Sequence, residues 1–183
     1  MVAGRRLIYM PLRSPGLTGQ QRGETDQLVG HLFRVHAPAL LRLALLLVGD
    51  QASAEDVVQE AFIGLHRASL RDQDKALPYL RVAVVNGCRS LHRARRRAAA
   101  MRPQHEPPVW SAEAAAIVNE DRREVLAAVA RLPRRPREVL ALRYYLGLAD
   151  AEIAATLGIS RGTVSSTVSR ALTALARDLG EES

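Results

Sequence analysis

Residues 150–176 carry the pattern that most restricts how this chain can fold, because two stretches with helical apolar spacing flank one glycine. Ile153 and Leu157 lie on one face of the first stretch. Gly158 can end that helix in the left-handed backbone region without a Cβ clash, and Ser160 is a favourable N-cap for a second helix. The segment therefore predicts two helices joined by a tight turn.

The second of these helices has an apolar inner face and a polar outer face. Residues at helical spacing form the predicted inner face: Val164, Val168, Ala171, Leu172 and Leu175. The outer face is small, hydroxylated and basic, and it comprises Arg161, Gly162, Ser165, Ser166, Ser169 and Arg170. Such a face can enter the major groove of DNA, in the arrangement of a helix-turn-helix. The alternative is an ordinary helical hairpin with a solvated face.

The composition of the 183-residue chain favours helices throughout. Hydrophobic residues make up 48% of the sequence but aromatic residues only 4%, so the cores must be built from Ala, Leu and Val. The single cysteine, Cys88, excludes an intrachain disulfide, and the five histidines have no metal-ligand spacing. We predict an all-α fold of two small helical domains joined by a flexible linker, with no metal site and no cofactor.

The net charge of +7 suits a polyanionic partner, although basic charge alone also fits a membrane surface. The apolar run at residues 39–48 is interrupted by Arg42 and is too short to cross a bilayer. The N-terminus lacks the continuous apolar core of a signal peptide. We therefore expect a cytoplasmic protein without a membrane span.

The distribution of Pro and Gly divides the chain. Residues 1–23 contain both types without helical periodicity, which predicts a flexible arm. Residues 24–99 form the first predicted domain and residues 114–183 the second. Between them, residues 100–113 contain three prolines and are typical of a linker.

Three helices are predicted in the first domain. The first covers about residues 25–48, with Pro38 expected to kink or divide it. The second covers about residues 52–67, and the third about residues 77–98. The polar segment 68–76 between them is predicted to be a loop.

The second domain is expected to open with two helices that precede the helix-turn-helix. The first covers about residues 114–131, and the next begins near Pro136 and ends near Gly147. Three arginines cluster at the start of this second helix, where they could contact phosphate or an acidic partner: Arg134, Arg135 and Arg137.

An acidic line on the helix at residues 52–67 is unusual in so basic a chain. Asp56, Gln59, Glu60 and Ile63 share one stripe of that helix. Paired carboxylates can catalyse reactions, but no nucleophile, metal ligand or substrate-pocket motif accompanies them, so we expect no enzymatic activity and no small-molecule substrate. The line is either a solvated helix face or a docking surface for a basic helical partner.

The helix at residues 77–98 has a basic outer side that contains Asn86, Arg89, Arg93 and Arg96. No acidic residue occurs between Lys75 and Glu106, so these arginines have no ion-pair partner on their own helix. That pattern favours an external anion, for which a phosphate backbone is the natural candidate. A solvated basic helix end is the alternative.

With both domains in place, residues 25–179 resemble the extracytoplasmic-function (ECF) group of bacterial RNA polymerase sigma factors, which have regions two and four but no region three. Residues 54–62 are similar to the family's region that docks on the clamp helices of the polymerase. Residues 132–143, which lead into residues 152–160, are similar to its region four. The order of these stretches and the linker between them make the resemblance specific.

The resemblance implies roles for two sets of residues in the first domain. The acidic line would bind the polymerase through Asp56, Gln59, Glu60 and Ile63. The loop from Ser69 to Asp74 would capture a flipped base of the minus-ten element, and the neighbouring helix would border the opened strand. The implied DNA contacts of this domain are Ser69, Arg71, Asp72, Tyr79, Asn86, Arg89, Arg93 and Arg96.

In the second domain, the resemblance implies that the helix-turn-helix reads the minus-thirty-five element as duplex DNA. The implied contacts are Arg161, Thr163, Ser165, Ser166, Ser169 and Arg170. Strand opening would then be promoted by binding, because a pocket that stacks an extruded base returns a free energy similar to the few kcal/mol that extrusion costs. The implied partners are core RNA polymerase and promoter DNA, with an anti-sigma factor as a further candidate.

Two other functions fit part of the pattern. A homodimeric helix-turn-helix regulator would bind operator DNA independently of the polymerase, but it leaves the acidic line and the basic strip unexplained. A DNA recombinase would need an α/β catalytic domain with a nucleophile, and the first hundred residues have no strand pattern.

Overall fold

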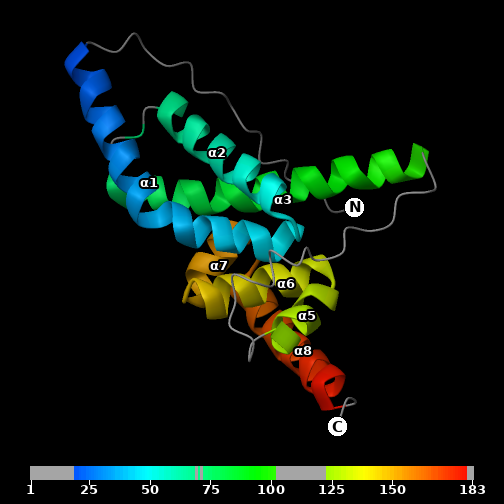
Figure 1. Cartoon of the computed structure of the whole chain (residues 1–183). Helices are drawn as coiled ribbons and strands as arrows, with labels where there is room; N and C mark the ends of the chain where they lie inside the picture. The colour runs from blue at the N-terminus through cyan, green and yellow to red at the C-terminus, as the bar shows by residue number, and fades with distance from the viewer. Residues whose placement is uncertain (1–18, 69, 71, 102–122, 181–183) are drawn as a thin grey trace, which may run out of the picture.

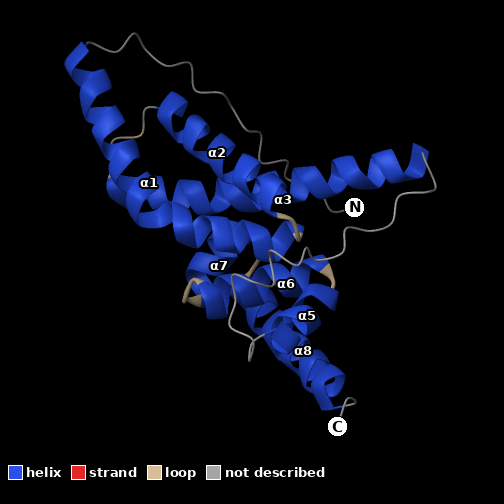
Figure 2. Cartoon of the chain, in the orientation of Figure 1, coloured by secondary structure: helices blue, strands red, loops and turns tan. Residues whose placement is uncertain are grey.

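The computed structural model describes residues 19–68, 70, 72–101 and 123–180 of the chain. Within these residues every regular element is helical and no strand occurs (Figure 2). The prediction of an all-α fold is confirmed. The helices form an upper group and a lower group in Figure 1, which contact each other along one side.

The upper group consists of α1 (Gly19–Val48), α2 (Gln51–Ala68) and α3 (Gln73–Met101), which pack against one another. Their buried apolar side chains are aliphatic apart from one aromatic ring and the thiol of Cys88, as the low aromatic content predicted. The largest of them include Leu32, Leu40, Leu43, Leu65 and Leu80, none of which is more than 2% exposed. Small and branched side chains allow these helices to approach closely, so the core of this group needs few aromatic rings.

Helix α1 is one continuous helix with Pro38 inside it, and its ribbon changes direction along its length (Figure 1). Proline lacks the backbone N–H that an interior helical position donates, and it commonly bends a helix without ending it. The prediction of a kink is therefore correct, whereas a division is not observed. The predicted flexible arm over residues 1–23 was too long, because α1 already begins at Gly19; residues 1–18 lie outside the described residues.

The corner between α1 and α2 is fixed by side chains from α3. Gly49 has a φ of 85°, which favours glycine, and Asp50 Oδ1 accepts from the backbone N–H of Ser53 at 2.9 Å. Arg95 of α3 donates to Asp50 Oδ2 at 2.5 Å and to the carbonyl oxygen of Val48 at 3.0 Å. This arginine therefore has a structural role that the sequence pattern did not reveal.

The lower group follows after residues 102–122, which lie outside the described residues together with the start of the helix predicted at 114–131. Its elements are α5 (Arg123–Arg131), α6 (Arg134–Leu140), the π-helix η2 (Ala141–Tyr145), α7 (Asp150–Leu157) and α8 (Arg161–Gly180). In η2 the backbone N–H of Leu146 donates to the carbonyl oxygen of Ala141, at the wider spacing of a π-helix. The helix predicted near Pro136 thus changes type before it ends.

Helices α7 and α8 form the predicted helix-turn-helix. Gly158 has a φ of 66°, and Ser160 Oγ accepts from the backbone N–H of Thr163 at 3.1 Å, as an N-cap does. The predicted inner face of α8 was wrong at one position, because Leu172 is 41% exposed whereas Thr167 is 5% exposed. The face centres on Val164, Thr167, Val168, Ala171 and Leu175, which rotates Leu172 toward its edge.

Residues 23–48 of α1 are long and apolar enough to cross a membrane by length and composition alone. A core helix of a soluble protein passes the same test, and residues 43–49 are buried within the fold. The apolar segment is thus longer than the run at residues 39–48 suggested, and the structure packs it against α2 and α3 in the upper group.

Candidate nucleic-acid and polymerase interfaces

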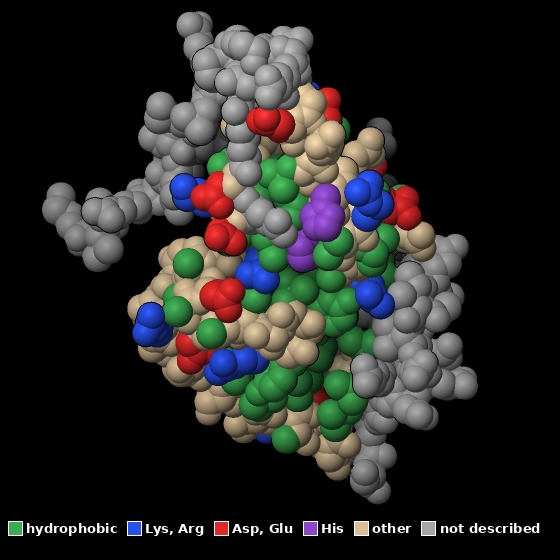
Figure 3. Space-filling model, turned by 90° about the vertical axis from the view of Figure 1, so that its left-hand side faces the viewer, with side chains coloured by type: hydrophobic (Ala, Val, Ile, Leu, Met, Phe, Trp, Pro, Cys, Tyr) green, Lys and Arg blue, Asp and Glu red, His purple; other side chains and the backbone are tan. Residues whose placement is uncertain are grey.

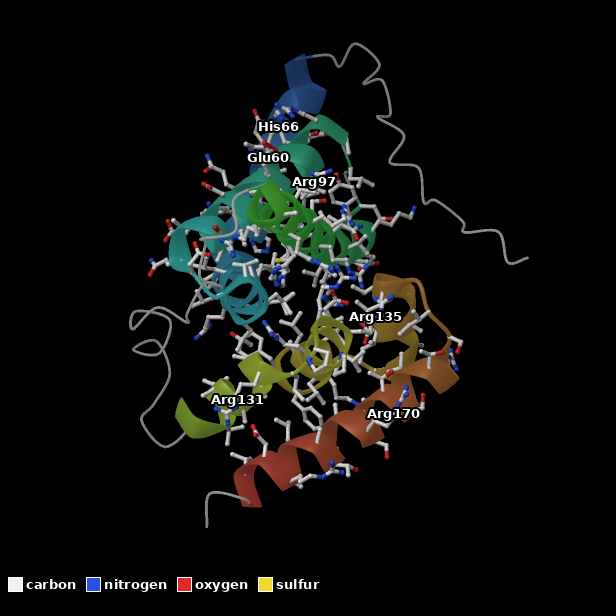
Figure 4. The ribbon with its side chains drawn as sticks, turned by 90° about the vertical axis from the view of Figure 1, so that its right-hand side faces the viewer. Glu60, His66, Arg97, Arg131, Arg135 and Arg170 are labelled. Carbon is white, nitrogen blue, oxygen red and sulfur yellow. The ribbon has the colours of Figure 1, made fainter. Side chains whose placement is uncertain are left out.

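The outer face of α8 presents every residue that the sequence assigned to duplex DNA. Arg161, Thr163, Ser165, Ser166, Ser169 and Arg170 are all exposed, while Val164 and Val168 anchor the helix from beneath. Arg170 Nε donates to the carbonyl oxygen of Ser166 at 3.2 Å, and its other guanidinium nitrogens remain on the surface of α8 (Figure 4). The face is therefore accessible, polar and held on a buried apolar base.

A carboxylate from α7 joins this face. Asp150 Oδ2 accepts a hydrogen bond from Ser165 Oγ at 3.0 Å, and Asp150 Oδ1 forms an ion pair with Arg143 Nη2 at 2.8 Å. Sequence reasoning missed this group, because Asp150 and Ser165 lie fifteen residues apart on different helices. Only the turn at Gly158 brings them together.

The basic side of α3 is partly open and partly engaged. Asn86, Arg93 and Arg96 are exposed, and Arg93 Nη2 donates to Ser90 Oγ on the same helix at 2.8 Å. The carboxy-terminal end of α3, where Figure 4 labels Arg97, extends beyond the rest of the upper group (Figure 1). Tyr79 is partly buried and packs against the core. Three of the predicted strand-binding residues thus remain accessible.

Arg89 is the exception, because it is held by the lower group of helices. Its Nε and Nη2 atoms donate to the two carboxylate oxygens of Glu138 at 2.8 and 2.6 Å, a bidentate pair. The Glu138 side chain is 2% exposed and that of Arg89 is 14% exposed. The anion expected for Arg89 is therefore supplied, in this arrangement, by the chain itself.

Glu138 gathers further arginines around the same carboxylate. Arg135 Nη1 lies 3.2 Å and Arg134 Nε 3.5 Å from its oxygens. Nearby on α3, Arg81 Nη1 pairs with Glu152 Oε1 of α7 at 3.1 Å. Sequence reasoning missed Glu138 and Glu152 as partners of α3, since neither lies near that helix in the chain.

The predicted base-capturing loop is shorter than expected. Helix α3 begins at Gln73, so Asp74 belongs to its first turn, and Ser69 and Arg71 lie outside the described residues. Asp72 Oδ1 accepts from the backbone N–H of Asp74 at 3.0 Å and Oδ2 pairs with Lys75 at 3.1 Å. The hydrogen bond from Lys75 lowers the pKa of Asp72 below its ordinary value. Asp72 therefore starts the helix as an ionised cap.

The acidic line on α2 is exposed and borders an apolar hollow. Asp56, Gln59 and Glu60 are exposed, and Ile63 is partly buried. The hollow lies between α1 and α2 and is lined by Val29, Phe33, Gln59, Phe62, Ile63, His66 and Arg67. Phe33 is 51% exposed, and its ring packs edge-on against Phe62 with the centroids 5.1 Å apart. The acidic side chains thus adjoin apolar surface that a partner could cover.

The candidate surfaces point in different directions. Figure 4 labels Glu60 on α2 near the top and Arg170 on α8 near the bottom, so the acidic line and the outer face of α8 lie at opposite ends of the molecule. The face in Figure 3 carries a broad area of apolar side chains with acidic and basic groups around it. No group of three or more His, Cys, Asp or Glu that could hold a metal ion occurs among the described residues.

Cys88 has no reactive character. It is 2% exposed in the core of the upper group, and burial raises the pKa of its thiol to about 12. A thiol with so high a pKa stays protonated at neutral pH, so Cys88 acts as a small apolar residue of the core.

Comparison with known proteins gives the family. Residues 32–98 match Sigma-70 region 2 and residues 122–175 match Sigma-70, region 4. The chain is 35% identical over 156 residues to the ECF RNA polymerase sigma factor SigL of Mycobacterium tuberculosis, covering 82% of this chain and 88% of that one. It is 33% identical over 148 residues to the RNA polymerase sigma-E factor of Streptomyces coelicolor, covering 80% and 82%.

Among solved structures, the chain is similar to CnrH, determined in complex with the cytosolic domain of CnrY. The TM-score is 0.64 with 26% sequence identity, over 89% of this chain and 99% of that one. The fold and both matched regions define a sigma-70-type transcription initiation factor. The chain belongs to the ECF group of RNA polymerase sigma factors, which bind core polymerase and promoter DNA.

Proposed function

We propose that this sigma factor divides its tasks among three surfaces: α2 binds core polymerase, α3 with the preceding loop binds the opened minus-ten strand, and α8 reads the minus-thirty-five duplex. The observation that carries the proposal is the outer face of α8, where all six predicted DNA contacts are exposed over a buried apolar base. A conventional regulator would use the same face, but it gives the acidic line on α2 no task.

The polymerase surface is proposed to be the acidic line Asp56, Gln59 and Glu60, together with Ile63 and the neighbouring hollow at Phe33. Exposed carboxylates attract a basic partner over a distance, and apolar contact then supplies affinity at short range. This combination suits a helical partner that carries a basic stripe beside an apolar one.

For the minus-ten strand, Arg89 must exchange the carboxylate of Glu138 for a phosphate. Both anions accept from a guanidinium in the same bidentate geometry, so the exchange conserves hydrogen bonds. We propose that the described arrangement is a closed one, and that it opens when the sigma factor binds polymerase and DNA. Asn86, Arg93 and Arg96 would then line one side of the strand with Tyr79, beside the loop containing Ser69, Arg71 and Asp72.

The division of tasks among three surfaces has consequences for the domain organisation of the protein. We propose that the upper and lower groups of helices act as separate domains, and that residues 102–122 between them form a linker that lets them move apart. The protein would work in the cytoplasm, without catalytic groups, since strand opening draws on binding free energy alone.

A regulatory protein is a further proposed partner. The similar CnrH was solved in complex with the cytosolic domain of CnrY, which supports a protein partner for this chain as well. An anti-sigma factor is the partner that the family resemblance implies. It would compete with the polymerase if it covered the hollow beside the acidic line.

A run-off transcription assay tests the function. Core polymerase and genomic promoter fragments are incubated with and without the protein, and specific transcripts should appear only when it is added. Binding to palindromic operator sites by the protein alone, with no polymerase-dependent transcript, would instead favour the regulator.

The docking surface is tested by a double variant. Asp56→Arg with Glu60→Arg reverses the charge of the line and should weaken core binding at least tenfold, measured by co-migration with core polymerase on a sizing column. Glu55→Arg is the matched control, because Glu55 is exposed on the same helix but outside the line. Equal binding by the double variant and the control would disprove the docking assignment.

A further inference from the structure

The Asp150 carboxylate sits at the outer face of α8 and engages the hydroxyl of Ser165. The Ser165 hydroxyl has a single proton, and the structure directs it to Asp150 Oδ2 at 3.0 Å. The remaining lone pairs of that hydroxyl stay available to a ligand on the outer face, where Ser165 is exposed. Because its proton is used in this bond, the Ser165 hydroxyl can accept a hydrogen bond from a ligand but has no proton left to donate.

The carboxylate is fixed in place by a second contact. Asp150 is the first residue of α7, and Arg143, just before the end of η2, pairs with its other oxygen at 2.8 Å. An aspartate carboxylate can accept hydrogen bonds but not donate them, so the proton in the bond between Ser165 and Asp150 belongs to Ser165. The positive charge of Arg143 offsets a negative charge that DNA phosphates would otherwise repel. The Asp150 side chain is 30% exposed, but its Oδ1 atom is buried, so only Oδ2 adjoins the outer face.

We infer that Asp150 is a positioning residue that makes Ser165 an acceptor toward DNA and so sets a base preference. The inference rests on the proposed role of α8 in the major groove. The groove edge of adenine presents an N6 amino donor and that of cytosine an N4 amino donor, whereas guanine and thymine present acceptor oxygens at the corresponding places. At the base that faces Ser165, adenine or cytosine would be favoured over guanine or thymine.

The neighbouring hydroxyl of Ser166 donates its proton to a different kind of acceptor. Ser166 Oγ donates to the carbonyl oxygen of Thr163 at 3.2 Å, which is a longer bond to a neutral acceptor within the same helix. A hydrogen bond to a carboxylate is about twice as strong as one to a neutral group, so the Ser165 proton is the harder to redirect. Ser165 is therefore the hydroxyl that we expect to act only as a hydrogen-bond acceptor toward DNA.

The test measures base preference in the upstream element, with holoenzyme assembled from core polymerase and the full chain. A promoter identified by run-off transcription is randomised across its minus-thirty-five element, and the bound pool is sequenced. We expect one base position at which adenine or cytosine is enriched about fivefold over guanine or thymine, the effect of roughly one hydrogen bond. Asp150→Ala and Ser165→Ala should each bring that enrichment close to unity and leave the other positions unchanged.

Two control variants separate positioning from support of the fold. Arg143→Met breaks the ion pair but keeps the bond between Ser165 and Asp150, so the enrichment should persist even if stability falls. Ser169→Ala removes a hydroxyl one turn further along α8 and should leave this position unaffected. An unchanged enrichment in Asp150→Ala, or an even loss of affinity for all sequences, would overturn the inference. The absence of any upstream preference in the unmodified protein would instead contradict the proposed role of α8.

Discussion

The two helices proposed to bind DNA, α3 and α8, carry similar side chains but differ in the contacts that those side chains already make. Among the described residues, the side chains of the α8 outer face form their hydrogen bonds within the helix-turn-helix, as Arg170 does with Ser166 and Ser165 with Asp150. On α3, by contrast, Arg89 and Arg81 bond to Glu138 and Glu152 of the lower group. The difference teaches that a basic helix face is available to DNA only where carboxylates from other helices do not already bind its arginines.

The strength of the contact at Arg89 follows from burial. Glu138 is 2% exposed and contacts three arginines, so no water competes for its oxygens and its charge is fully compensated. The pair between Arg81 and Glu152 leaves the Glu152 side chain 51% exposed and contributes little by itself. Four predictions test this contrast.

The largest effect is expected from Glu138→Ala. The substitution leaves Arg89, Arg134 and Arg135 without their carboxylate, and removing one partner from a buried charge cluster costs about 3–5 kcal/mol. Chemical denaturation measures the loss of unfolding free energy. Glu152→Ala is the control and should cost at most about 1 kcal/mol, because its pair is exposed. An equal loss of unfolding free energy in the two variants would show that burial does not strengthen the contact at Glu138.

Next comes Glu138→Gln, which keeps the shape of the side chain and removes its charge. The guanidinium of Arg89 then exchanges a neutral amide for a phosphate, so single-stranded DNA should bind about threefold to tenfold more tightly. Fluorescence anisotropy with a single-stranded minus-ten oligonucleotide measures the affinity. Asp178→Asn is the matched control, since Asp178 pairs with Arg131 away from α3. A gain of the same size in both variants would show that overall charge, and not release of Arg89, is responsible.

Two arginines on α3 sharpen the comparison within a single helix. Arg95→Ala removes the hydrogen bonds to Asp50 and Val48 and should lower the free energy of unfolding by about 1–3 kcal/mol. Arg93→Ala should leave stability nearly unchanged but weaken single-strand binding and reduce its salt dependence by about one phosphate contact. Thermal melting and salt titrations distinguish the two. The reverse pattern would mean that Arg95 faces the strand.

The smallest effect concerns pH. Burial opposes ionisation of Asp50, but hydrogen bonds from Arg95 and Ser53 outweigh it and hold its pKa below the ordinary value of 3.8. Because the pKa is lower in the folded state, this contribution is present above about pH 4 and is lost as the pH falls through the folded pKa. Asp50→Asn should therefore destabilise the protein by about 1 kcal/mol at neutral pH, with the difference shrinking in acid. A constant difference from neutral pH into acid would refute the assignment.

The sequence predicted those parts of the molecule that depend on local periodicity. Gly158 and Ser160 mark the helix-turn-helix without any tertiary information, and the acidic line at Asp56 and Glu60 follows from helical spacing. The roles of Arg89 and Arg95 could not be predicted in this way, because their partners Glu138 and Asp50 lie 49 and 45 residues away in the chain. Local patterns identify a charged face, whereas its occupancy depends on the tertiary fold.

The same distinction explains the smaller errors. Leu172 fits the apolar spacing of α8 but lies at the edge of the buried face, since the contacts with α5, α6 and α7 fix the rotation of the helix. The early start of α3 depends on Asp72, whose capping bonds extend a helix into a segment with weak apolar periodicity. Packing fixes the rotation of α8, and capping fixes the residue at which α3 begins; helix propensity alone predicts neither.

The distance between the two helix groups is the most direct measure of whether the closed arrangement gives way when DNA is bound. Spin labels at Ala52→Cys on α2 and Ala174→Cys on α8 occupy exposed positions outside the proposed interfaces, and buried Cys88 should stay unlabelled. Pulsed electron resonance should report one short distance in the free protein and a longer one with core polymerase and promoter DNA. An unchanged short distance in a transcriptionally active complex would contradict the release of Arg89 from Glu138.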